Sequence, residues 1–121
     1  MPDARRQLGA AGEALVAQWY ERAGWQVVDR NWRVKAGELD LVVARGRTRA
    51  FCEVKTRSSA LFGSPAEAVT VVKQLRLRRL AAAWLAAHAV HGVDVRFDVA
   101  SVLVDRAGRA TIEVIEGAFG N

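Results

Sequence analysis

The sequence predicts an α/β fold in which one mixed sheet packs against helices. Helical periodicity runs over residues 4–23 and again over about 71–89, and five short segments of strand character surround the second helix. The expected order is therefore helix, three strands, helix, two strands. At 121 residues the chain has the length of a single domain, residues 1–121, that buries its own core.

The two helices are marked by apolar stripes and by end signals. The stripe of the first helix consists of Leu8, Gly12, Leu15, Val16 and Trp19. Gly24 follows it as a stop. Residues 64–67, Ser-Pro-Ala-Glu, resemble a capping box and predict a short helical turn near 65–69. Thr70 is a second candidate cap for the long helix.

The strands follow from alternation and from turn residues. Residues 25–34 predict a first strand, and residues 37–57 predict two strands joined at Gly46 as a hairpin. Residues 93–104 alternate at period two, and after a turn residues 110–116 supply the last strand.

The predicted hairpin carries charges inside its strands. One face holds Glu38, Asp40 and Val42 on the first strand and Phe51, Glu53 and Lys55 on the second. A two-residue or a four-residue loop gives the same register, in which Asp40 faces Glu53 and Glu38 faces Lys55. A three-residue loop would shift this register by one.

Opposed carboxylates destabilise a sheet, and a divalent cation between Asp40 and Glu53 would remove the penalty. Lys55 could then orient a metal-activated water or stabilise charge on a phosphate. The alternative is a solvated strand surface. The opposite face is expected to be core, and it consists of Leu39, Leu41, Val43, Cys52 and Val54. Cys52 is interpreted as a small buried hydrophobic residue rather than a nucleophile.

The charge balance favours an anionic partner, nucleic acid first, because the net charge is +5 and the pI is about 10.3. The arginine-rich usage can also reflect genome composition, so it is weak evidence alone. The lone Cys52 excludes an internal disulfide and suggests a reducing compartment. Neither a secretory signal nor a membrane-spanning run is apparent, so a cytoplasmic location is expected.

An acidic residue in the first helix, then Asp, then Glu-x-Lys on the next strand is the layout of the PD-(D/E)xK nuclease superfamily. The chain resembles the small bacterial YraN-type family, which is similar to the archaeal Holliday-junction resolvases. The resemblance covers nearly the whole chain and implies a restriction-endonuclease-like, mixed five-stranded sheet flanked by helices. The matching residues are Gly12-Glu13, Arg30-Asn31-Trp32-Arg33, Gly37-Glu38-Leu39-Asp40-Leu41, Glu53-Val54-Lys55-Thr56-Arg57-Ser58, Lys73-Gln74, Arg96-Phe97-Asp98-Val99 and Ala118-Phe119.

The resemblance implies a Mg²⁺ or Mn²⁺ site made by Asp40, Glu53 and the backbone carbonyl of Val54. Lys55 takes the position of the catalytic lysine, Glu13 that of the helix acid, and Gln74 that of the motif glutamine. The superfamily name has proline before the aspartate, where this chain has Leu39. Because proline does not bind the metal in that motif, this difference leaves the implied metal site unchanged.

The supporting residues have simpler alternative interpretations. Glu13 lies at the margin of the predicted buried face, where a surface glutamate is ordinary. Gln74 falls in the apolar sector of its helix, where its amide needs partners, and a helix-end bond to backbone would supply one. The candidate nucleic-acid contacts are Arg30, Arg33, Lys35, Arg57, Lys73 and Arg76. The alternative for these residues is a solvated basic surface.

The leading hypothesis is a Mg²⁺- or Mn²⁺-dependent DNA endonuclease that hydrolyses phosphodiesters and acts in DNA repair or recombination. Its partner would be DNA, which could be branched or single-stranded, rather than a membrane, and analogy with resolvases suggests a homodimer. The first alternative is a non-catalytic nucleic-acid-binding module. The second is a structural adaptor whose hairpin charges are only surface.

Overall fold

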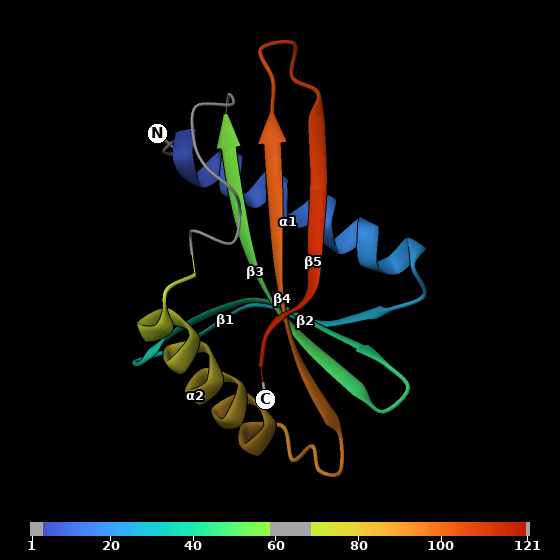
Figure 1. Cartoon of the computed structure of the whole chain (residues 1–121), viewed down its shortest axis with the longest axis vertical. Coiled ribbons are helices and arrows are strands. Elements are labelled where there is room, and N and C mark those ends of the chain that lie inside the picture. Colours follow the sequence, from blue (N-terminus) through green and yellow to red (C-terminus); the bar gives the residue numbers. More distant parts are fainter. Residues whose placement is uncertain (1–3, 59–68, 121) are drawn as a thin grey trace.

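The computed structural model describes residues 4–58 and 69–120. The elements follow the predicted order (Figure 1). They are α1 (Ala4–Arg22), β1 (Gln26–Val34), β2 (Gly37–Arg45), β3 (Thr48–Ser58), α2 (Val71–Ala87), β4 (Asp94–Val104) and β5 (Ala110–Phe119). The predicted cap at 64–67 and most of the helical turn near 65–69 lie outside the described residues.

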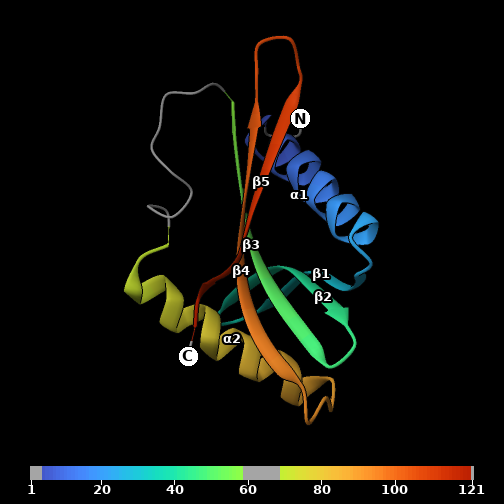
Figure 2. The same cartoon turned by 45° about the vertical axis from the view of Figure 1, so that its right-hand side comes forward.

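The sheet has the strand order β1-β2-β3-β4-β5 and is mixed, as predicted. Among the described strands only β3 and β4 run parallel to each other, and the chain between them passes through α2. The remaining neighbours are antiparallel. Figure 2 shows α1 and α2 on opposite sides of the sheet. The α/β class with a five-stranded sheet between helices is thereby confirmed.

Each face of the sheet has its own apolar cluster, because a helix covers each face. The cluster under α1 contains Val16, Ala17, Tyr20, Trp25, Leu41, Val43, Ala50, Cys52, Ala100 and Val102. The cluster under α2 contains Leu39, Val42, Phe51, Val69, Leu77, Leu80, Ala81, Trp84, Phe97 and Val99. The burial predicted for Cys52 is confirmed. Val42 and Phe51, which were predicted on the charged face of the hairpin, are therefore part of the apolar cluster under α2.

Leu39 corrects the predicted core face. It was expected beside Leu41, yet it packs in the α2 cluster while Leu41 packs under α1. At this point β2 leaves β3 and continues paired with β1, where Asn31 has a left-handed backbone with φ +50°. Period-two alternation holds only for a regular extended strand, so it fails across this bend.

The hairpin turn has two residues, Gly46 and Arg47, with Arg45 paired to Thr48. Gly46 has φ +56°, the backbone conformation that a tight hairpin turn requires and glycine adopts freely. The predicted register is confirmed from this turn to the pair formed by Leu41 and Cys52.

The start of α2 is capped by Thr70, the second of the two predicted caps. Its hydroxyl accepts a hydrogen bond of 3.2 Å from the backbone N–H of Lys73. This cap satisfies a backbone N–H of the first turn and marks the start of α2 at Val71. Within residues 4–58 and 69–120, neither helix has both the length and the apolar character needed to span a bilayer.

Candidate functional site

The acidic residues gather where the pairing of β2 with β3 ends. The last pair of this ladder is Leu41 with Cys52. One residue further along, Asp40 Oδ2 accepts a hydrogen bond of 2.8 Å from the backbone N–H of Val54. A side chain here replaces a strand-to-strand bond, so the Asp40 carboxylate is held against the backbone next to Glu53.

Asp40 is the electrostatic centre of this group. Burial, followed by the negative charge of Glu53, raises the pKa of Asp40 to about 7. Glu13 and Glu38 raise this pKa further, whereas the bond from Val54 lowers it. We call Glu13, Glu38, Asp40 and Glu53 the carboxylate cluster. Among the described residues, no three His, Cys, Asp or Glu side chains are placed so that together they could hold a metal ion.

Glu13 reaches the carboxylate cluster because Gly12 lets α1 lie close to β3. A Cβ atom added to Gly12 would lie 2.9 Å from the Cβ of Thr56, which is closer than side chains tolerate. Glu13 itself is half-buried, and this burial raises the pKa of its carboxyl group. A hydrogen bond with the Asn31 side chain lowers that pKa in part, and the charge of Glu38 raises it.

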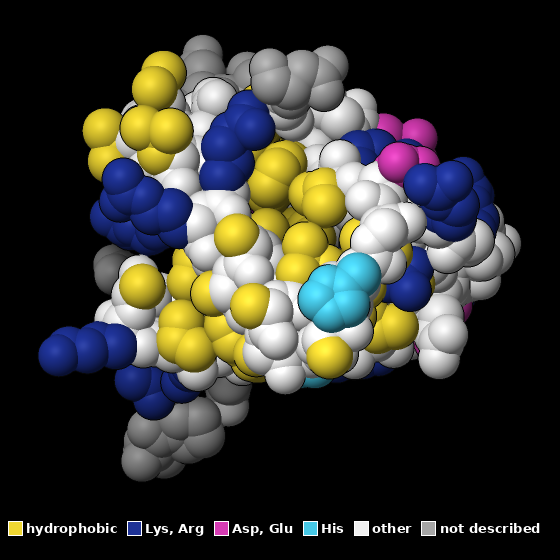
Figure 3. Space-filling model, turned by 90° about the horizontal axis from the view of Figure 1, so that it is seen from below, with side chains coloured by type: hydrophobic (Ala, Val, Ile, Leu, Met, Phe, Trp, Pro, Cys, Tyr) yellow, Lys and Arg dark blue, Asp and Glu magenta, His cyan; other side chains and the backbone are white. Residues whose placement is uncertain are grey.

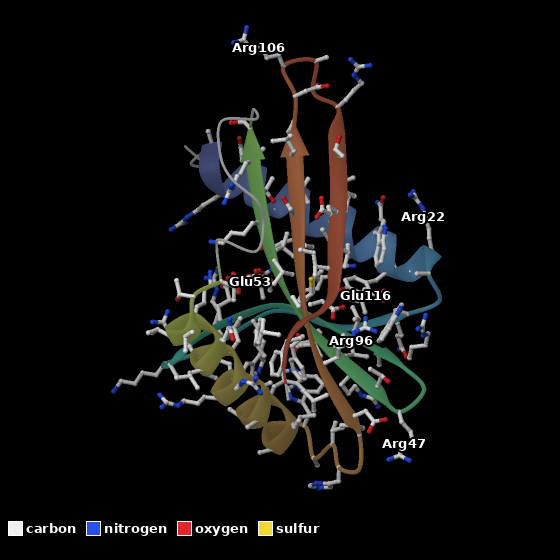
Figure 4. The ribbon with its side chains drawn as sticks, in the orientation of Figure 1. Arg22, Arg47, Glu53, Arg96, Arg106 and Glu116 are labelled. Atoms are coloured by element: carbon white, nitrogen blue, oxygen red, sulfur yellow. The ribbon has the colours of Figure 1, made fainter. Side chains whose placement is uncertain are left out.

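Two lysines face the carboxylates. Lys73 Nζ, in the first turn of α2, lies 3.1 Å from Glu53 Oε1, and Figure 4 shows Glu53 on the side of β3 toward the start of α2. Burial lowers the pKa of Lys55, and the neighbouring Lys73 lowers it further, while Glu53 and Asp40 oppose both effects. The structure therefore brings Glu13, Asp40, Glu53 and Lys55 together as predicted, and it adds Lys73 to them.

Glu38 does not lie opposite Lys55, which corrects the predicted register beyond Leu41, where the ladder between β2 and β3 ends. Its cross-strand partner is Arg33 on β1, and the Arg33 guanidinium also forms an ion pair with its carboxylate. The reason is that β2 has separated from β3 and pairs only with β1 at this point.

The side chain of Gln74 forms a hydrogen bond to the backbone at the start of α2. Its side-chain amide donates a hydrogen bond of 3.3 Å to the carbonyl of Val69, which is the alternative considered for a polar residue in this sector. No described contact joins it to Asp40 or Glu53.

The other predicted nucleic-acid contacts are spread over the surface. Arg30, Arg33, Lys35 and Arg76 are exposed, and Arg57 is half-buried. On the face shown in Figure 3, Lys and Arg side chains are distributed widely, whereas acidic side chains are confined to its edge.

Asn31 is a residue of the site that the pattern alone did not single out. Its neighbours Arg30 and Trp32 pair with Leu41 and Leu39, so the residue opposite Asn31 is Asp40. Asparagine is depleted in strands and tolerates φ above zero, so its position inside a strand segment was the available signal.

A second buried acid, Asp98, has a different environment. It is 1 % exposed and accepts hydrogen bonds from the Tyr20 hydroxyl at 2.6 Å and from the Gly117 N–H at 3.0 Å. Arg96 adds two bonds of 2.8 Å from its Nε and Nη2 atoms. Gly117, with φ +60°, lies near a bulge that lets β5 run past its predicted end at residue 116. The bonded partners of Asp98 compensate its burial, whereas Asp40 has like charges as neighbours.

Fold and site together define a small basic α/β protein with a carboxylate–lysine cluster where two strands separate. The chain belongs to the family described as "Uncharacterised protein family UPF0102", whose model matches residues 12–102. This is the membership that the YraN-type motifs predicted.

Similar proteins match over almost their whole length. A UPF0102 protein of Beutenbergia cavernae is 54 % identical over 114 residues, which cover 94 % of this chain and 97 % of that protein. One from Rhodococcus jostii is 47 % identical over 112 residues, covering 93 % and 95 %. One from Moorella thermoacetica is 47 % identical over 116 residues, covering 95 % and 97 %.

Proposed function

We propose that this protein is a divalent-metal-dependent DNA endonuclease of the PD-(D/E)xK superfamily, similar to the Holliday-junction resolvases and acting in DNA repair or recombination. The observation that carries the proposal is the pair of adjacent carboxylates, Asp40 and Glu53, at the point where β2 and β3 separate. Lys55 and Lys73 beside them supply positive charge for a phosphate.

The residues present fit Mg²⁺ or Mn²⁺. This ion usually takes one or two carboxylates from the protein and completes its shell with water and substrate phosphate oxygens. Asp40, Glu53 and the carbonyl of Val54 would provide the protein ligands. The raised pKa of Asp40 is consistent with this role, because a bound cation would relieve the repulsion that raises it. When bound, such an ion lowers the pKa of a water molecule and polarises a phosphoryl oxygen.

The surrounding residues position these groups. The Val54 N–H orients the Asp40 carboxylate, and Lys55 would place its ammonium group against the phosphate undergoing attack. Glu13, beside Asn31, would accept a hydrogen bond from the water on the α1 side. Gln74 could take part only if its amide left the carbonyl of Val69.

The basic residues would hold the rest of the DNA. Phosphate contacts fix the position and orientation of a nucleic acid without reading its sequence. The residues proposed for this role are Arg30, Arg33, Lys35, Arg57, Lys73 and Arg76.

The test is a cleavage assay on branched, flapped, single-stranded and plain duplex DNA with Mg²⁺ or Mn²⁺. Wild type should cut at least one of these shapes, and Asp40→Asn should lose that activity. Equal behaviour of the two proteins on every shape would sink the proposal.

A non-catalytic nucleic-acid-binding module is the second candidate. The ion pair of Lys73 with Glu53 favours it, because that pair neutralises one carboxylate without a metal. Calorimetry with Mn²⁺ separates the two candidates. An endonuclease should give binding heat that Glu53→Gln removes, whereas a binding module should give none.

A further inference from the structure

A pocket of about 430 Å³ lies beside Asp40 and Glu53 and shares Glu13 and Glu38 with the carboxylate cluster. We call it the α1–β1 pocket. It is lined by Arg6, Gly9, Ala10, Glu13, Asn31, Arg33 and Glu38. Its volume falls in the range typical of small-molecule sites, so it can admit one compact ligand next to Asp40 and Glu53.

The α1 wall of this pocket has two small residues, Gly9 and Ala10, at its centre. Arg6, Gly9, Ala10 and Glu13 follow one another at helical spacing and so lie on one side of α1. Gly9 has open space where a side chain would begin, since among the described residues no atom beyond its chain neighbours and the backbone of α1 lies within 4 Å of a Cβ added there. A planar group could therefore lie against the backbone of α1 at Gly9 and Ala10.

The β1 wall supplies polar groups in an unusual backbone conformation. Asn31 has φ +50° inside a strand, and its side chain lies close enough to Glu13 to lower the pKa of that carboxyl group. Such a conformation is costly for most residues and is found often at binding sites. An asparagine amide and a carboxyl group side by side offer both donors and acceptors, which is what the edge of a nucleobase requires.

The rim of the pocket carries positive charge. Arg6 and Arg33 are both exposed, and the ion pair with Glu38 holds Arg33 at the opening. Guanidinium groups in this position suit the phosphates of a nucleic-acid strand.

We propose that the α1–β1 pocket binds one unpaired nucleotide of a DNA strand, with its base against Gly9 and Ala10 and its edge bonded to Asn31 and Glu13. The link between this nucleotide and the cut rests on the proposed endonuclease function, because the cluster would cut the adjacent phosphodiester. Extracting a base from an intact duplex costs free energy, and the cost is least for a base that is already unpaired. The pocket therefore selects flaps, junction strands and single strands over plain duplex.

The test fills the pocket without disturbing the fold. Gly9→Leu places a side chain into open space, and replacing a helical glycine favours the helix. The control is Ala11→Leu, which adds the same side chain at an exposed position on another side of α1. The probes are a fluorescein-labelled DNA hairpin with a short single-stranded tail and the same hairpin with abasic sites in its tail. Binding is followed by anisotropy in EDTA.

The expected result is that Gly9→Leu binds the normal tail about tenfold more weakly and the abasic tail as well as wild type does. Ala11→Leu should match wild type on both. The proposal is overturned if Gly9→Leu retains full affinity for the normal tail, or if it loses affinity for both tails equally. Competition by a free deoxynucleoside monophosphate as strong as that of the tail would overturn the assignment to a DNA strand.

The two proposals fail in different ways. A wild type that cuts DNA, with binding indifferent to Gly9→Leu, overturns the pocket alone. A wild type that prefers the base-containing tail but neither binds Mn²⁺ nor cuts overturns the endonuclease and leaves the nucleotide pocket in place.

Discussion

Lys73 Nζ lies 3.1 Å from Glu53 Oε1, so an ion pair ties the first turn of α2 to the strand that carries a proposed metal ligand. The lysine charge occupies a position against Glu53 that a divalent cation would also seek. Metal binding should therefore compete with this ion pair, and the first prediction follows from that competition.

Replacing Lys73 with methionine should tighten Mn²⁺ binding by about fivefold, the equivalent of about 1 kcal/mol for one partly buried ion pair. The variant removes the competing charge and keeps much of the apolar stem. Isothermal titration calorimetry measures the affinity. Arg79→Met is the matched control, because Arg79 is an exposed cation of the same helix outside the cluster. Unchanged or weaker binding by Lys73→Met would contradict competition.

Asp40→Asn should stabilise the fold at pH 8 and leave it nearly unchanged at pH 4. The folded pKa of Asp40, about 7, lies above that of the unfolded chain, so the folded state binds the extra proton. The contribution of this proton to the free energy of unfolding is complete below about pH 4 and is lost as the pH rises through 7. The asparagine oxygen can still accept the Val54 N–H, so the gain at pH 8 should be on the order of 2 kcal/mol.

Urea denaturation at the two pH values measures this difference in the free energy of unfolding. Mn²⁺ should stabilise wild type and not the variant. An equal gain at pH 4 and pH 8 would show that the charge of Asp40 is not its cause.

Asp98→Asn should have the opposite effect on stability, although Asp98 is also buried. Its carboxylate accepts two hydrogen bonds from Arg96, and the substitution removes the nearer of the two carboxylates that pair with this guanidinium, since Glu116 lies at 3.8 Å. Removing one partner of a buried ion pair costs about 3 kcal/mol. The same denaturation experiment at pH 8 compares the two variants, and Mn²⁺ affinity should stay as in wild type. A stability equal to that of wild type would contradict the role assigned to Asp98.

Two glycines of α1 should respond oppositely to alanine. Gly12→Ala forces a Cβ against Thr56, so it should destabilise the fold by about 1–3 kcal/mol despite the better helix propensity of alanine. Gly9→Ala meets open space and should stabilise the fold by about 0.5–1 kcal/mol. Thermal unfolding of both variants provides the comparison. If both substitutions changed the stability in the same direction, close packing of α1 on β3 could not be the reason why residue 12 is a glycine.

The sequence was sufficient to predict the order of helices and strands, the hairpin register up to Leu41 and the helix cap at Thr70. These features depend on neighbours in the chain, which a periodic pattern and a turn residue record directly. It did not predict the cluster to which Leu39 belongs, because strand alternation assumes that β2 does not bend.

The proximity of the candidate site residues was predicted only in part, because a sequence pattern records neighbours along the chain. Asp40, Glu53 and Lys55 are close in the hairpin, so the pattern brought them together. The contact of Lys73 with Glu53 depends on where α2 docks, and the role of Asn31 depends on a backbone conformation of β1. Both are set by tertiary packing between segments far apart in the chain.

The hydrogen bond from Val54 to Asp40 has a spectroscopic consequence. The amide that donates it belongs to the residue between Glu53 and Lys55, so its proton senses the charge of the carboxylate directly. In a ¹⁵N–¹H correlation spectrum this one peak would follow protonation at Asp40, and it would show whether a cation or a nucleic acid binds beside that carboxylate. The chemical shift of the Val54 amide therefore reports the charge of Asp40 without any chemical modification of the protein.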